Sequence, residues 1–314
     1  MLVSAIPVAA KRNATGVWFL VLAGVLWGTG GLTGSLLARR AGLDPLAVAA
    51  YRLGVGGLLI VVFRALTRRP VPRGRPAWRR IVAIGLLAAV FQAAYFAAVA
   101  LLSVSLATLL TIGASPVLVL LAEATKRRPG PAAFGTVGLA VAGLTLLVGV
   151  PSAGRDLATL LAGGGFALLA AGGFATMTMI GSRPVPGLDD LAATGWAFTL
   201  GAAVLAPLAA ASGGVSFAVS PAGVGLLLLL GLGPTAIAYA AYFRGLRTAP
   251  AGTAALMALL EPLVGTALAV LILGDRLSPA GLAGAALLIT ALILEPAARR
   301  NRSDGAGLAG AEYD

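Results

Sequence analysis

Ten apolar stretches follow one another along the 314-residue chain, separated by short polar gaps. Each is about 15–25 residues long, close to the length that a helix needs to cross the hydrocarbon core of a bilayer. The stretches are continuously apolar rather than alternating, so helices are expected instead of barrel strands. We predict an all-α integral membrane protein with ten transmembrane helices at residues 16–38, 45–63, 81–101, 104–122, 131–150, 157–181, 191–211, 222–243, 251–273 and 280–295.

The composition supports this class and excludes several functions. Charged residues make up only 11% of the chain, against about 25% in soluble proteins. The net charge of +12 does not indicate a nucleic-acid partner, because the basic residues lie in the gaps between spans, where they set topology. The chain has no cysteine and no histidine, which excludes disulfides, Cys or His metal sites and histidine-dependent catalysis. We therefore expect no cofactor, no bound metal and no enzymatic activity.

The distribution of Lys and Arg predicts the orientation. If the N-terminus is cytoplasmic, 18 basic residues lie in inside segments, four lie in outside segments, and Arg52 lies within a span. This asymmetry follows the positive-inside rule. We expect a multi-pass protein of the plasma (inner) membrane with both termini cytoplasmic. The longest internal loop, residues 64–80, is too short for a soluble domain, and residues 303–314 read as a disordered tail.

The two halves of the chain repeat each other at an offset of 145–146 residues. The segment "YFAAVALLSVSLATLLTIGASP" ends at Pro116, and "AYFRGLRTAPAGTAALMALLEP" ends at Pro262. Likewise "LDPLAVAAY" ends at Tyr51 and "LDDLAATGW" ends at Trp196. Each half holds five spans, so the second half enters the membrane from the opposite side. We predict two inverted five-helix repeats, residues 1–152 and 153–302, with a substrate site near the midplane.

Several short motifs carry a resemblance to a known family. They are "LWG" at residues 26–28, "YRLG" at 51–54, "LLEP" at 259–262 and "LGDRLSPAGLAGAALLITALIL" at 273–294. With the ten spans and the repeat, the chain resembles an EamA-type member of the drug/metabolite transporter superfamily over residues 16–296. It departs from the pattern at Asp275, where the family often has Glu. The resemblance implies a central cavity formed by spans one, three, four, six, eight and nine.

Polar and aromatic side chains share helical faces on several of these spans, which marks faces turned away from lipid. The candidate substrate-binding residues are Trp27, Thr29, Thr33, Gln92, Tyr95, Thr108, Thr111, Ser115, Thr235, Tyr239, Tyr242, Met257 and Glu261. The alternative for each Thr or Ser is a hydrogen bond to a carbonyl of its own helix.

Glu261 is a carboxylate deep within an apolar run, about ten residues or roughly 15 Å from its start. A functional role is the default at such depth: it would bind a substrate amine or carry a proton, and the alternative is a neutral packing residue. The structural residues are expected to be Pro116 and Pro262, which are repeat equivalents that each leave a carbonyl unpaired, and Arg52, which would pair with carbonyls or extend outward. An alternative for Arg52 is a pairing with Glu261, which no spacing in the sequence supports.

Small residues recur at helical spacing on the fifth and tenth spans, at Gly138 and Ala142 and at Gly281 and Ala285. Such residues allow helices to approach closely. We interpret these two spans as packing elements or as the surface of a homodimer.

The prediction that follows is a secondary transporter, an exporter of small metabolites such as amino acids, working by alternating access. The sequence holds no G-x-x-x-x-G-K-[ST] motif for ATP, so an ion gradient or the substrate's own gradient would drive it. The partners are a small-molecule substrate and the lipid bilayer. The alternatives are a flippase for a lipid-linked molecule and, with less support, an integral-membrane enzyme or a passive channel.

Overall fold

The computed structural model describes residues 5–102, 104–125, 131–148, 156–273 and 278–310. These residues are helical and contain no β-strand beyond one isolated bridge. The elements are α1 Ala5–Ala41, α2 Pro45–Leu66, α3 Arg75–Leu101, α4 Val104–Ala124, α5 Pro131–Val148, α6 Leu157–Gly181, α7 Asp190–Ala211, α8 Pro221–Gly231, η1 Leu232–Ile237, α9 Ala238–Gly245, α10 Ala251–Met257, α11 Leu260–Leu268, η2 Ala269–Leu273 and α12 Pro279–Gly310.

The predicted spans correspond to these helices in order. In the described part of the chain, nine segments have the length and hydropathy to cross a membrane, and a tenth apolar segment, Pro279–Leu294, is shorter. The eighth span consists of α8, η1 and α9, and the ninth of α10, α11 and η2. The all-α membrane class is therefore confirmed, whereas the count of ten depends on the short last segment.

Two boundaries differ from the sequence prediction. The loop expected over residues 64–80 is shorter, because α2 continues to Leu66 and α3 already begins at Arg75. At the other end, α12 continues to Gly310 and so enters the segment expected to be disordered from residue 303. Hydropathy marks where an apolar run ends, but a helix with its backbone bonds satisfied can extend beyond that point into water.

Polar caps and prolines fix where the helices begin. The side chains of Asp156, Asp189 and Ser220 precede α6, α7 and α8 and accept hydrogen bonds from backbone N–H groups of the first turn. Pro45 and Pro221 occupy the first turns of α2 and α8, where no hydrogen bond is lost. The turns between spans are thus specified by local chemistry.

The eighth span widens into a π-helix at η1, which the sequence analysis did not predict. Pro234 lies in this segment, and the Thr235 hydroxyl donates to the Leu230 carbonyl at 2.8 Å, five residues back. A proline removes a backbone donor, and a π-turn with a side-chain bond satisfies the freed carbonyl.

The two prolines predicted to be structural behave differently. The ninth span breaks between α10 and α11, just before Pro262, and the Glu261 N–H bonds the Ala258 carbonyl three residues back at 3.0 Å. By contrast, α4 passes through Pro116 as one helix. The repeat equivalence of the two positions therefore does not extend to their backbone geometry.

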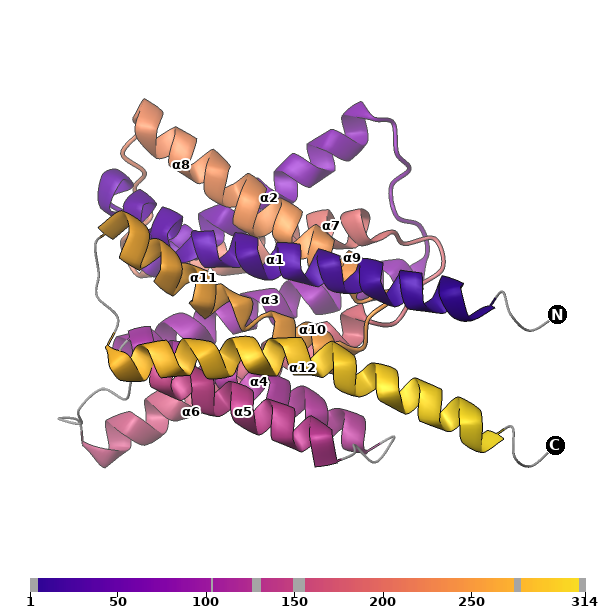
Figure 1. Ribbon diagram of the computed structural model, residues 1–314. Helices are drawn as coiled ribbons and strands as arrows, with labels where there is room; N and C mark the ends of the chain where they lie inside the picture. Colours follow the sequence, from indigo (N-terminus) through magenta and orange to yellow (C-terminus); the bar gives the residue numbers. More distant parts are fainter. Residues whose placement is uncertain (1–4, 103, 126–130, 149–155, 274–277, 311–314) are drawn as a thin grey trace.

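The two halves of the chain pack between each other's helices. The principal pairs are α2 with α7, α5 with α12, α3 with α6, and α1 with both the eighth and ninth spans. Equivalent helices run in opposite directions, since the start of α2 meets the end of α7 at Asp44 and Gly214, and the end of α2 meets the start of α7 at Arg64 and Asp189. α1 begins and α12 ends on the same side of the bundle, which we call the termini side (Figure 1).

Candidate functional site

An aromatic cluster lies at the centre of the bundle. The ring of Trp27 on α1 contacts Tyr239 and Tyr242 on α9, with centroids 4.8 and 5.0 Å apart, and Phe174 on α6 at 5.9 Å. Phe198 on α7 packs against Tyr239 at 4.6 Å. All five side chains are buried. Rings at these separations stabilise one another beyond the area they bury, so four spans are fixed together here.

Two hydrogen bonds extend this cluster across neighbouring spans. The Tyr242 hydroxyl pairs with Thr178 on α6 at 2.7 Å, and the Tyr95 hydroxyl on α3 pairs with Thr108 on α4 at 2.8 Å. Trp27 differs, because its Nε1–H is buried and has no hydrogen-bond partner among the described residues. A buried donor without a partner is uncommon and calls for an explanation.

Four of the predicted hydroxyls serve helix packing. Thr29, Thr33 and Ser115 donate to carbonyls of their own helices at 2.7–2.8 Å, the alternative considered for such residues. Thr111 instead reaches the Ala167 carbonyl of α6 at 3.3 Å.

Two further candidates, Gln92 on α3 and Met257 on α10, are buried in the core. Sequence periodicity placed them on the correct helices, but it could not say whether their side chains face a neighbouring helix or a substrate path.

Arg52 and Glu261 lie within electrostatic range of each other, although they come from different halves of the chain. The Arg52 Nε–H donates to the Thr235 hydroxyl at 3.3 Å. The charge of Arg52 acts on the Glu261 carboxylate, and both charges act on the hydroxyls of Tyr95 and Tyr239. Arg52 was expected to be structural, and its pairing with Glu261 was an alternative that no spacing in the sequence supported.

Depth could have indicated this pairing. Arg52 lies about seven residues, or ~11 Å, from the start of α2 on the side opposite the termini. Glu261 lies about ten residues, or ~15 Å, from the start of α10 on the termini side. In a core about 30 Å thick the two side chains are therefore at nearly the same level.

The backbone break in the ninth span positions Glu261. Gly24 and Gly28 let α1 lie directly against the break: a Cβ atom on Gly28 would stand 2.9 Å from the Glu261 carbonyl, and one on Gly24 would stand 2.7 Å from the Met257 carbonyl. The two sides of the break differ in burial. Every residue of α10 is buried, whereas α11, which carries Glu261, has no buried residue.

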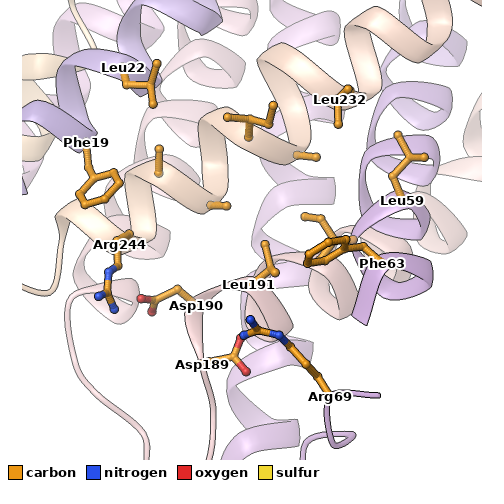
Figure 2. Close-up of a pocket in the computed structure, with 15 residues that line it drawn as sticks. Phe19, Leu22, Leu59, Phe63, Arg69, Asp189, Asp190, Leu191, Leu232 and Arg244 are labelled. Carbon is orange, nitrogen blue, oxygen red and sulfur yellow. The ribbon is translucent and has the colours of Figure 1, made fainter. Parts of the chain in front are cut away.

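A separate pocket of about 660 Å³ lies between α1, α2, the start of α7, and η1 with α9. Figure 2 shows an apolar wall with Leu22, Leu59 and Leu232, and a charged end with Arg69 and Arg244. None of the predicted site residues lines it. On the eighth span, the pocket residues Ala236 and Ala240 each lie one position after Thr235 and Tyr239. Neighbouring positions of a helix point in different directions, so the pocket lies on a different face of this span from Thr235 and Tyr239.

Comparisons with known proteins agree with this architecture. The "uncharacterized transporter YwfM" of Bacillus subtilis is 31% identical over 231 residues, which cover 73% of this chain and 75% of the relative. The "uncharacterized protein PA1977" of Pseudomonas aeruginosa is 32% identical over 222 residues, 68% of this chain and 71% of the relative. A crystal structure with 19% identity superposes with a TM-score of 0.73, covers 90% of this chain and 96% of its own, and supports the fold alone.

The sequence profile described as the EamA-like transporter family matches twice, at residues 14–149 and 161–294. These matches correspond to the two repeats expected from the internal offset. The geometry agrees, since the two halves contribute helices that run in opposite directions to one bundle. The chain belongs to the EamA-like transporter family and is a multi-pass membrane transporter of the drug/metabolite transporter type.

Proposed function

We propose that the protein is a secondary transporter of small zwitterionic metabolites such as amino acids, and that Glu261 and Arg52 bind the two charged ends of the substrate. The single observation that carries the proposal is that these opposite charges, which come from different halves of the chain, lie within electrostatic range of each other. A guanidinium suits a carboxylate, and a carboxylate suits an ammonium group. Charged side chains inside a membrane mark substrate and ion paths by default.

The surroundings of the charge pair support the same substrate class. Tyr95 and Tyr239 lie within electrostatic range of both charges and present hydroxyls that can bond a polar substrate. The Nε1–H of Trp27 is a buried donor that a substrate carbonyl or carboxylate can meet. The aromatic faces of the central cluster also suit an apolar side chain.

Alternating access is the mechanism that we propose. The aromatic cluster and α10 are buried, which closes the path toward the termini side, whereas α11 has no buried residue on the other side of the break. This asymmetry is what one end state of such a cycle requires. Inverted repeats supply the opposite state when the two halves exchange conformations.

The direct test is transport by proteoliposomes containing Glu261→Gln, which keeps the size of the side chain and removes its charge. We expect loss of gradient-driven uptake and of its pH dependence, with normal insertion. Glu123→Gln is the matched control, because the Glu123 carboxylate caps the Gly252 N–H at 3.1 Å and a Gln oxygen can still accept that bond. Wild-type transport and unchanged pH dependence in Glu261→Gln would refute the proposed site.

Export, a plasma-membrane location and cytoplasmic termini complete the proposal. The cytoplasmic termini are supported by the charge asymmetry between loops, since 18 basic residues fall in the segments on the side of the termini. The absence of native cysteine allows a single cysteine at Arg73 to report topology. We expect an impermeant thiol reagent to label it only after the cells are opened. The homodimer stays a prediction, and lipid flip-flop in the same proteoliposomes tests the flippase alternative.

A further inference from the structure

We infer that the pocket between α1, α2, α7 and α9 is a binding site for an anionic phospholipid of the leaflet on the termini side. This inference does not depend on the proposed substrate, because neither Glu261 nor Arg52 is among the residues that line the pocket. It rests on three features of the pocket: its shape, its charge and the way its basic residues are held.

The body of the pocket is apolar and open to the surrounding lipid. Its walls are formed by Phe19, Leu22, Leu59, Phe63, Leu232 and Ile237. Several of these side chains are large and exposed, with Phe63 at 50% and Leu232 at 50% of their full accessibility. A cavity of about 660 Å³ falls within the range of roughly 300–1,000 Å³ typical of small-molecule sites. An acyl chain is the occupant that the bilayer offers to such a wall.

The polar end of the pocket lies where helices end, at head-group level. Arg69 follows the end of α2, Arg244 lies in the last turn of α9, and Asp189 and Asp190 stand at the start of α7. Figure 2 shows these four side chains gathered at one end and Leu22 and Leu232 at the other. The chemistry therefore changes from charged to apolar along the pocket, as it does along a phospholipid.

The two aspartates are already neutralised by other arginines. Asp189 pairs with Arg64 at 2.7 Å, and Asp190 accepts from the Nε–H of Arg247 at 2.6 Å. Among the residues that the structure describes, the guanidinium groups of Arg69 and Arg244 have no partner. Arg64 and Arg247 balance the two aspartates, so the positive charges of Arg69 and Arg244 remain for a ligand. Basic pockets between transmembrane helices bind anionic head groups in this way.

The backbone that carries Arg69 is held in place before any ligand arrives. The Arg69 N–H donates to the Arg64 carbonyl at 2.9 Å. The Arg64 guanidinium in turn donates to the carbonyl of Pro70, the residue that follows Arg69, at 2.8 Å. Arg64 is itself buried and fixed by Asp189. Binding therefore needs no ordering of this loop, which lowers the entropic cost of association.

The experiment is a titration of dioleoyl phosphatidylglycerol into the full chain in detergent, followed by native mass spectrometry. We expect one saturable phosphatidylglycerol per chain and weaker binding of the zwitterionic phosphatidylcholine. Each of Arg69→Gln and Arg244→Gln should weaken phosphatidylglycerol binding about fivefold, and the double variant about 30-fold. Arg73→Gln is the matched control, because Arg73 is an exposed arginine of the same loop that does not line the pocket.

A second variant tests the apolar part of the pocket with all charges kept. Ala240→Leu places a larger side chain in the wall and should weaken phosphatidylglycerol binding without affecting insertion. Glycerol 3-phosphate and inorganic phosphate, which lack acyl chains, should not compete. Equal binding of both lipids, equal losses in Arg73→Gln and Arg69→Gln, or Arg69-dependent movement of phosphatidylglycerol between leaflets would overturn the inference of a resident lipid.

Discussion

Close contact between the fifth and last spans gives a sharp prediction, because one glycine of α5 is in contact and another is not. A Cβ atom on Gly143 would lie 2.7 Å from the Leu288 nitrogen and 2.9 Å from the Gly284 carbonyl oxygen of α12. A Cβ atom on Gly138, on the same helix, would meet nothing within 4 Å. Ordinary contact begins near 3.4 Å, so Gly143→Ala must separate two backbones by about 0.7 Å, taken as the difference between these distances.

The magnitude follows from comparing the two substitutions. Both replace Gly by Ala within a helix, which favours the helix by about 1 kcal/mol in each case. This gain cancels in the comparison. Overpacking costs about 1–3 kcal/mol, and here the clash is with backbone, which cannot rotate away. We therefore expect Gly143→Ala to be about 1–3 kcal/mol less stable than Gly138→Ala.

The assay is thermal or denaturant unfolding in detergent, followed by circular dichroism and size-exclusion chromatography of both variants beside the wild type. Gly138→Ala should match or exceed the wild type, and Gly143→Ala should unfold earlier. Equal stability of the two alanine variants would mean that α5 and α12 do not meet at Gly143 and Gly284. The reasoning about this contact would then be wrong.

Two further outcomes follow from hydrogen bonds at Tyr242 and Asp156. Tyr242→Phe leaves the buried Thr178 hydroxyl without its 2.7 Å partner and should lower the unfolding free energy by about 1–3 kcal/mol. Adding Thr178→Val removes the unpaired hydroxyl and should restore most of that loss. A double variant no more stable than Tyr242→Phe would contradict this. Two hydrogen bonds from Thr159 hold the pKa of Asp156 below its usual value. The cap of α6 is therefore complete above the ordinary Asp pKa, and it is lost as the pH falls through the lowered pKa of Asp156. The protection of the Thr159 amide against exchange, taken relative to the intrinsic rate at each pH, should therefore fall in acid. Asp156→Ser should remove this pH dependence, and an identical protection profile in both proteins would argue against the cap.

Hydropathy and the internal repeat predicted the helical membrane fold, because the bilayer restricts what such a chain can form. Apolar length gave the spans, and the internal offset gave repeats that the family profile also matches. The features that the sequence did not predict depend on how the helices rotate and bend. The small residues expected to pack were Gly138 and Ala142, yet contact occurs at Gly143, because glycines lie on several faces of α5 and periodicity alone cannot choose among them.

The candidate site was predicted in part for the same reason. The depth of Glu261 is a property of one segment and can be read along the sequence. Its proximity to Arg52 depends on two segments in different halves, and only a comparison of depths could have suggested it. The π-helix at η1 had a local signal in Pro234, within an otherwise apolar run. The pocket near Arg69 had none, because it arises from the angles at which four spans pack.

The interleaving of the two halves also constrains how the protein is made. Arg64 forms its ion pair with Asp189, which lies 125 residues later in the chain. At a synthesis rate of about 5–20 residues per second, the second half of this contact emerges ~6–25 s after the first. During that interval the glycine-rich face of α2, where Gly57 will meet α7, is exposed to lipid or to other chains. The first five spans therefore cannot complete their packing alone, and newly inserted copies are open to pairing with the wrong partner until synthesis passes α7.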